Sequence, residues 1–191
     1  MDHIKYAKDF AENGIDIYAS EGTLNALELQ GHRYKSIKAL QQFNIGDFTI
    51  LPFDTEHDAI EPLGFLIQYN PTKERLLYAT DTYYIKYKFK ELNYIMIECN
   101  YIKEIARKNM KEGTINKSRY TRLLESHMSL ENLLAFLKSN DLRHVQKIIL
   151  CHLSDTNSNA ETMKNEVFKM TGIETIIADK NLITELKKYP F

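Results

Sequence analysis

The sequence predicts a mixed α/β (α+β) domain, a sandwich with a sheet core and helices outside. Three observations predict it. Short apolar strands separated by turn signals such as Asn70-Pro71 fill residues 34–99. Helical periodicity follows over about residues 102–141. A buried strand, an amphipathic helix and a last strand complete the chain. Strands followed by this kind of alternation favour a sheet with helices packed on it.

The chain opens with a helix rather than a strand. Apolar residues recur at helical spacing over residues 3–12, and Asn13-Gly14 supplies a stop signal. Residues 16–20 predict a short strand, and Ser20 is an N-cap for a helix over residues 21–27 that ends by Gly31. The first part of the chain therefore contains a strand–helix step.

The remaining elements follow in order. We expect strands at residues 34–37, 47–53, 63–69, 75–80 and 93–99, which resemble the meander of one sheet. Helices are predicted at residues 102–113, 119–126 and 129–141, then a strand at 146–152, a helix at 161–172, a strand at 174–179 and a tail. No repeat, low-complexity tract or linker interrupts them. We therefore expect a single domain over residues 1–191.

The composition limits the classes of function. A chain of 191 residues with 43% hydrophobic and 27% charged residues is long enough to bury a core. The formal net charge of -1 gives no basic excess, so binding to nucleic acid would depend on a local patch. Cys99 and Cys151 lie in apolar runs, which suits buried thiols in a reducing compartment. No stretch approaches the ~20 apolar residues of a membrane span, and we expect a cytoplasmic protein.

Three potential metal ligands follow apolar strands. His57, Asp81 and His152 each lie where a predicted strand ends, and loops at strand ends commonly carry site residues. A single histidine in such a place is more often a hydrogen-bonded structural residue, but three groups of these types favour a divalent-metal site. Asp2 and His3 adjoin the start of the first helix and could turn toward one ion. Alone, that pair carries no signal.

The order of these residues resembles the metallo-β-lactamase superfamily. In that family a His-x-His-x-Asp-His loop precedes a helix, and a second histidine, a bridging aspartate and a final histidine follow at later strand ends. Asp2-His3 resembles the end of that loop. The segments at residues 55–67, 79–82 and 151–154 resemble the other three motifs, so the match covers almost the whole chain. Within the family, residues 18–27, 57–65, 126–129 and 152–157 look like a phage and bacterial exonuclease-like branch.

The resemblance implies roles for these residues. His57 would belong to a first metal site, Asp81 would bridge two ions, and Asp2, His3 and His152 would complete a second site. Asp2 would also orient the nucleophile, as a catalytic residue. In such sites a divalent ion lowers the pKa of bound water to roughly 7.

Two further residues match the family. His127 resembles an extra histidine that lies between the bridging aspartate and the final histidine, where it would contact a substrate phosphate in catalysis. A helix cap explains His127 equally well. Glu98 resembles an acidic position that supports a metal ligand from outside the ligand shell in phosphodiesterase-type relatives. As a strand-end acid, Glu98 is also explained as a structural or solvated group.

The N-terminus departs from the family pattern. The family's loop carries two more histidines just before the position of Asp2, with strands ahead of them, whereas this chain begins at Met1. We therefore expect an αββα sandwich that lacks its first N-terminal strands and binds one ion. A truncated product, or a gap filled by a partner subunit, is favoured over a monomeric two-metal enzyme. A homodimer would cover the sheet edge or apolar patch that the missing strands leave exposed.

Two functions of different classes follow. The first is a metal-dependent hydrolase that acts on phosphodiester bonds, with nucleic acid or another phosphodiester as substrate and no membrane partner. The second is a degenerate, non-catalytic protein with partial metal binding. Thioesterase or glyoxalase-like chemistry on the same fold ranks below the nuclease-like hydrolase. The resemblance favours zinc, while manganese and iron also suit histidine and aspartate ligands.

Overall fold

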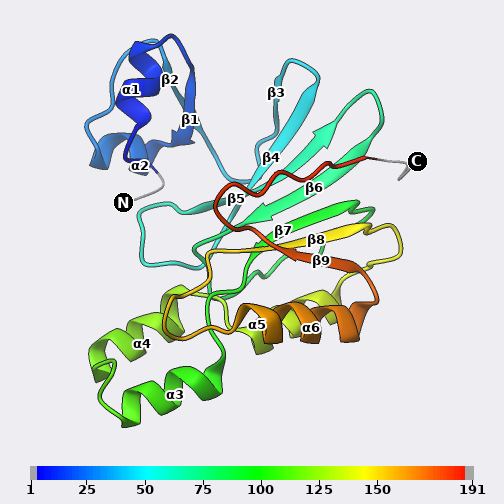
Figure 1. Cartoon of the computed structure of the whole chain (residues 1–191). Helices are drawn as coiled ribbons and strands as arrows, with labels where there is room; N and C mark the ends of the chain where they lie inside the picture. The colour runs from blue at the N-terminus through cyan, green and yellow to red at the C-terminus, as the bar shows by residue number, and fades with distance from the viewer. Residues whose placement is uncertain (1–3, 188–191) are drawn as a thin grey trace.

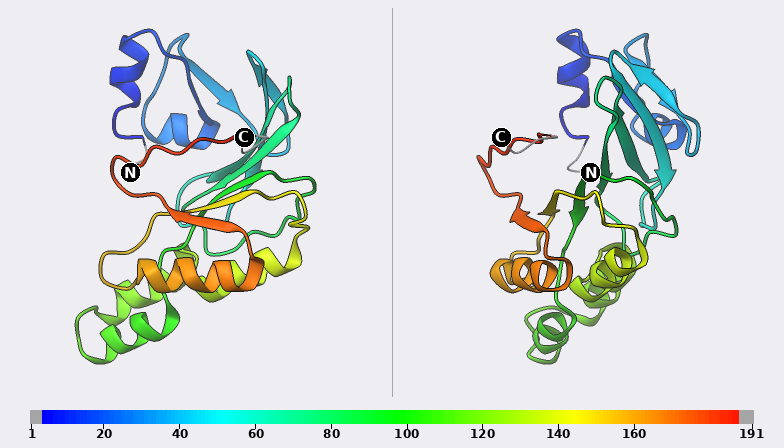
Figure 2. Two further views of the ribbon diagram at one scale, coloured as in Figure 1. Left: turned by 45° about the vertical axis from the view of Figure 1, so that its right-hand side comes forward. Right: turned by 90° about the vertical axis from the view of Figure 1, so that its right-hand side faces the viewer.

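The protein folds as a mixed α/β sandwich, as the sequence predicts. The computed structural model describes residues 4–187. A seven-stranded sheet crosses the centre, helices α3 to α6 lie on one side of it, and a small α/β layer lies on the other side (Figure 1). The turned views in Figure 2 show the same separation between the N-terminal layer and the helices.

The small layer is the N-terminal unit, residues 4–37. It contains α1 (Ala7–Glu12), β1 (Ile17–Ser20), α2 (Glu21–Ala26) and β2 (Tyr34–Ile37), with β1 and β2 paired in parallel. Ser20 is the N-cap of α2, as predicted, because its hydroxyl accepts a hydrogen bond from the Thr23 N–H. Helix α2 ends well before Gly31, since the chain turns at Glu28, where φ is 52°.

The large sheet has the order β3-β4-β5-β6-β7-β8-β9. Its strands are β3 (Phe43–Ile45), β4 (Phe48–Asp54), β5 (Leu63–Tyr69), β6 (Glu74–Ala79), β7 (Tyr94–Glu98), β8 (Lys147–Cys151) and β9 (Glu174–Ile177). Strands β3 to β6 are antiparallel and β6 to β9 are parallel.

The predicted meander is therefore only partly right. It holds for β4, β5 and β6, but β2 pairs with β1 in a separate sheet, and β7 runs parallel to β6. The connection at residues 80–93 is long enough to return the chain to the start of the next strand, which a parallel pair requires. Strand β3 is an additional short element, joined to β4 through Gly46, whose φ is 52°.

The four later helices lie on one side of the large sheet, with α5 and α6 next to it (Figure 1). They are α3 (Lys103–Lys111), α4 (Lys117–Ser126), α5 (Leu130–Ser139) and α6 (Ala160–Thr171). Leu133 and Leu137 of α5 are fully buried and pack in one cluster with Ile95 of β7 and Leu150 of β8. Gly172 ends α6 in the left-handed conformation, with φ at 70°, as its place in the sequence predicts.

Two other features agree with the sequence. Cys99 and Cys151 are buried free thiols. Within residues 4–187, every helix is too short or too polar to cross a lipid bilayer.

Candidate metal centre

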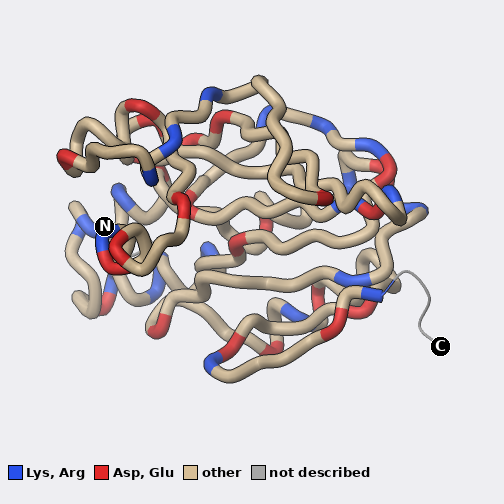
Figure 3. Tube along the Cα trace, turned by 90° about the horizontal axis from the view of Figure 1, so that it is seen from above, with Lys and Arg blue, Asp and Glu red and all other residues tan. Residues whose placement is uncertain are grey.

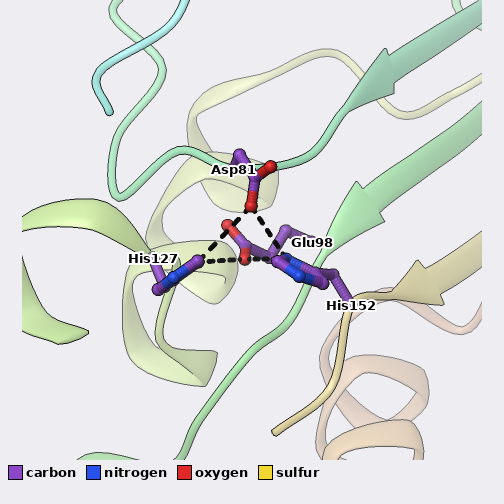
Figure 4. Close-up of side chains that lie close together, drawn as sticks. All are labelled: Asp81, Glu98, His127 and His152. Atoms are coloured by element: carbon purple, nitrogen blue, oxygen red, sulfur yellow. Dashed lines mark hydrogen bonds and ion pairs between the residues drawn. The ribbon is translucent and has the colours of Figure 1, made fainter. Parts of the chain in front are cut away.

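Four side chains that could bind a metal ion meet at one edge of the large sheet. Asp81 lies two residues after β6, Glu98 is the last residue of β7, His152 directly follows β8, and His127 is the C-cap of α4. One potential ligand atom from each lies within 4.8 Å of the others (Figure 4). The ends of adjacent parallel strands lie at the same edge of a sheet, which is why residues far apart in sequence converge here.

Glu98 holds this cluster together from below. Its carboxylate is fully buried, and Oε1 lies 2.7 Å from Nδ1 of both His127 and His152. The other oxygen, Oε2, accepts hydrogen bonds from the backbone N–H groups of Thr82 at 3.0 Å and Met128 at 3.1 Å. A buried carboxylate needs such partners, and here they also fix the orientation of both imidazole rings.

The same contacts set the charge of Glu98. Burial alone would raise the pKa of its carboxyl group, but the hydrogen bonds from His127 and His152 outweigh burial and hold the pKa below its ordinary value. The carboxylate is therefore ionised at neutral pH. Because Asp81 Oδ1 approaches the same two Nδ1 atoms, these are the imidazole nitrogens that converge with the carboxylates.

Asp81 lies above the two histidines. Its Oδ1 is 3.1 Å from His152 Nδ1 and 3.7 Å from His127 Nδ1. Asp81 and His152 both have positive φ angles, 50° and 55°. Residues other than glycine seldom adopt this conformation, which here turns each side chain back toward the cluster directly after its strand.

His57 approaches Asp81 from a third direction. It lies in the loop after β4, and its Nε2 is 3.9 Å from Asp81 Oδ1. Burial lowers the pKa of His57, and it prevails over the opposite effect of the Asp81 carboxylate. A neutral imidazole is the form that binds metal ions.

A cavity of about 760 Å³ opens beside these residues. His57, Asp81, His127 and His152 line one part of it. The N-terminal unit supplies an apolar wall that includes Tyr6, Phe10 and Tyr18. A substrate in this cavity would therefore contact both the polar cluster and an apolar surface.

The structure brings together five of the residues that the sequence singled out: His57, Asp81, Glu98, His127 and His152. His127 is both a helix cap and a member of the cluster, so its two interpretations are compatible. Asp2 and His3 lie outside the described residues, and their roles stay predictions.

Two residues that line the cavity were not identified from the sequence. Asp58 and Arg122 line it and form an ion pair, although 64 positions separate them. Asp58 directly follows His57 within the family motif at residues 55–67, and this adjacency is the one signal in the sequence that points to it. The sequence indicates only that Arg122 lies on an amphipathic helix. No local pattern shows that this helix packs beside the loop after β4.

The donor set fits a divalent ion. Carboxylate oxygens and imidazole nitrogens converge on one point, with an ionised, buried carboxylate behind the imidazoles. Zinc, manganese and iron all accept such ligands. Asp81 and His152 are the residues placed to hold an ion, and His57 and His127 lie beside them.

Comparison with known proteins identifies the family. Residues 1–153 match the family described as the β-lactamase superfamily domain. The chain belongs to the metallo-β-lactamase superfamily. The resemblance seen in the sequence motifs is thereby confirmed at the level of the superfamily.

Individual proteins are similar to this chain in sequence or in fold. The chain is 28% identical over 181 residues to exodeoxyribonuclease YycJ of Bacillus anthracis, a match that covers 87% of this chain and 65% of that protein's length. The metallo-β-lactamase fold protein YhfI of Bacillus subtilis superposes with a TM-score of 0.65 at 16% identity, covering 96% of this chain and 73% of YhfI. A diphosphatase of the PhnP family superposes with a TM-score of 0.53 at 14% identity, covering 86% of this chain and 55% of that one.

Proposed function

We propose that the chain is a metal-dependent hydrolase of phosphodiester bonds, with nucleic acid as the favoured class of substrate. The observation that carries the proposal is the cluster of Asp81, His127 and His152, anchored by the buried Glu98 at the wall of a cavity. The similarity to an exodeoxyribonuclease, and the fold shared with a diphosphatase, favour a phosphate ester over other substrates.

Asp81 and His152 would hold the ion, with His57 also beside Asp81. When bound, a divalent ion supplies a nucleophilic water at neutral pH and stabilises the negative charge that develops on the phosphate. Zinc is the favoured ion and manganese the second choice. Asp2 and His3 keep the roles that the resemblance implies, as ligands and, for Asp2, in orienting the nucleophile.

His127 is the candidate proton donor. Glu98 accepts a hydrogen bond from its Nδ1, which fixes the orientation of the ring and would leave Nε2 to exchange a proton with substrate. In this arrangement, His127 carrying a proton on each ring nitrogen would bind a phosphate oxygen through Nε2–H and pass that proton to the oxygen of the leaving group. The bond from phosphorus to that oxygen breaks as the bond to the water oxygen forms. The attacking water would lose its own proton to solvent, and His127 would then regain one from solvent.

The test uses the full chain loaded with Zn²⁺ or Mn²⁺. Hydrolysis of bis(p-nitrophenyl) phosphate and of single-stranded DNA is measured together with metal content. Removing a residue that supports a metal ligand typically lowers metal affinity or activity 10–100-fold. Removing a ligand itself should cost at least as much, so Asp81→Ala and His152→Ala should lose about a hundredfold or more in kcat/KM and also lose metal. His127→Ala should keep its metal and lose kcat, whereas loss of metal would make His127 a ligand.

A matched control and a contrary outcome complete the test. His144 is exposed and belongs neither to the cluster nor to the lining of the cavity, and His144→Ala should leave activity and metal content unchanged. Metal binding without hydrolysis of either substrate would instead support the non-catalytic alternative. Protein that binds no metal under any loading condition would contradict the proposal outright. Dimer formation stays a separate prediction, checked by sedimentation of the same protein.

A further inference from the structure

Arg122 is the one cation among the described residues that line the cavity. It lies on α4, five positions before His127, so one short helix carries both side chains to the same cavity. The Arg122 side chain is 72% exposed. Its place beside the candidate metal centre is therefore not explained by packing in the core.

A series of contacts links Arg122 to the centre. Arg122 Nε donates a hydrogen bond of 2.8 Å to Asp58 Oδ2. Asp58 Oδ1 lies 3.3 Å from His57 Nδ1, and His57 Nε2 faces Asp81. Asp58 thus holds the guanidinium at the cavity. Asp58 itself contacts His57, which lies beside Asp81.

The pairing with Asp58 leaves Arg122 able to bind another anion. A guanidinium carries five N–H donors, and only Nε–H takes part in a hydrogen bond with a described residue. An exposed ion pair of this kind contributes little net free energy, so exchanging its carboxylate for another anion costs little. The fork of the terminal amino groups matches two oxygens of a phosphate group.

The charge of the rest of the molecule gives an anionic substrate little attraction to the cavity. The formal net charge is -1, and Figure 3 shows lysine and arginine interspersed with aspartate and glutamate around the chain. The cavity itself carries Asp58 and Asp81. Apart from a bound ion, a phosphate ester entering the cavity would meet no general positive field, and Arg122 supplies a local positive charge.

We propose that Arg122 breaks its contact with Asp58 and binds a non-bridging phosphate oxygen of the substrate. This contact selects anionic phosphate esters over neutral esters. This inference rests on the proposed function for the reaction that follows binding. The anion-binding step is separate from catalysis and can be measured without it.

The experiment measures binding by fluorescence anisotropy with two labelled dinucleotides. One has a negatively charged phosphorothioate link and the other an uncharged methylphosphonate link. Both probes are titrated with the full chain, metal-free and loaded with Mn²⁺. Arg122→Ala should weaken binding of the charged probe about 10- to 100-fold, the loss expected from a hydrogen bond between charged groups, and should leave binding of the neutral probe unchanged.

Two further variants sharpen the test. Arg119 is exposed on the same helix and does not line the cavity, so Arg119→Ala should change binding less than about twofold. Asp58→Asn should tighten binding of the charged probe by freeing Arg122. That gain should disappear in the double variant Asp58→Asn, Arg122→Ala, because the two residues are coupled.

Each result of these titrations either supports or overturns the inference about Arg122. Equal binding of the charged probe by the wild type and Arg122→Ala would overturn the inference, as would no binding by the wild type. Equal losses in Arg122→Ala and Arg119→Ala, or equal losses for both probes, would also overturn it. Arg122-dependent binding in a protein that hydrolyses neither test substrate would contradict the proposed function and leave this inference standing.

Discussion

The N-terminal unit and the remainder of the protein, here the main unit, differ in how their elements are held. In the main unit, nineteen buried side chains form one apolar cluster between the sheet and its helices. In the N-terminal unit, the buried cluster has three members, Ala7, Leu24 and Leu29, beneath a parallel sheet of two strands. Parallel strands are normally buried on both faces in larger sheets, so the smaller unit has far less to stabilise it.

This difference divides the site by function. The described residues of the metal cluster all come from the main unit, while the N-terminal unit supplies the apolar wall of the cavity. Rigid elements hold ligands in place, and less stable segments adjust to substrate. Among the described residues, the candidate metal ligands and the apolar wall of the cavity therefore come from different parts of the chain.

Core truncations should give the largest contrast. Leu133 is fully buried in the main cluster, and Leu133→Ala should lower the free energy of unfolding by about 2–5 kcal/mol. Leu24→Ala, in the small cluster, should leave the main transition almost unchanged and increase hydrogen exchange only in residues 7–37. Urea denaturation and exchange measured by mass spectrometry separate the two. Equal losses in the main transition would show that both units unfold together.

The carboxylate beneath the cluster should matter next. Glu98→Gln removes the charge that orients His127 and His152, so metal affinity should fall about 10–100-fold, measured by competition with a chelator. Glu125 is exposed on α4, and Glu125→Gln is the control. Ser20→Ala, in the N-terminal unit, should leave metal affinity unchanged. A large loss there would mean that the smaller unit also shapes the ligand set.

Alkaline pH should weaken the main unit through a buried phenol. Burial raises the pKa of Tyr101 to about 12, whereas the ordinary value is 10. The folded state retains a proton that the unfolded state releases, so this stability is present below pH 10 and is lost as pH rises from 10 to 12. Between pH 8 and about 10.5, the wild type should lose about 1 kcal/mol more than Tyr101→Phe in urea denaturation. Tyr84→Phe, at a 54% exposed residue, should behave like the wild type.

The smallest effect should come from one helix cap. The Ser20 hydroxyl accepts from Thr23 N–H and donates to Thr23 Oγ1 at the start of α2. Ser20→Ala should destabilise the N-terminal unit by about 1 kcal/mol, seen as faster exchange of the α2 amides. Ser36→Ala, at an exposed position of β2, is the control within the same unit. Slower folding or a lower main transition in Ser20→Ala would contradict the separation of the two units.

The sequence predicted most elements because their signals are local. The apolar face of α5, the cap at Ser20 and the glycine that ends α6 each depend on neighbouring residues. The pairing of strands does not, and two errors followed. Strand β2 was assigned to the meander, and the parallel return to β7 was missed, because both depend on connections that a sequence does not orient.

The candidate site shows the same limit. Strand-end positions identified His57, Asp81 and His152 as candidates, and the family motifs added Glu98 and His127. Arg122 had no such signal, since its meaning depends on the packing of α4 beside a loop 64 residues earlier. Asp81 and His152 illustrate a further gap, because no pattern in the sequence indicates their left-handed backbone.

Those two backbone conformations bear on how such a protein changes over generations. Holding a residue with a side chain at positive φ costs on the order of 1 kcal/mol, which glycine would avoid. Glycine would therefore relax the backbone at these two positions, whereas Asp81 and His152 supply side chains to the candidate site. If the proposed activity were no longer needed, glycine at these two positions would relieve this cost while the architecture persisted.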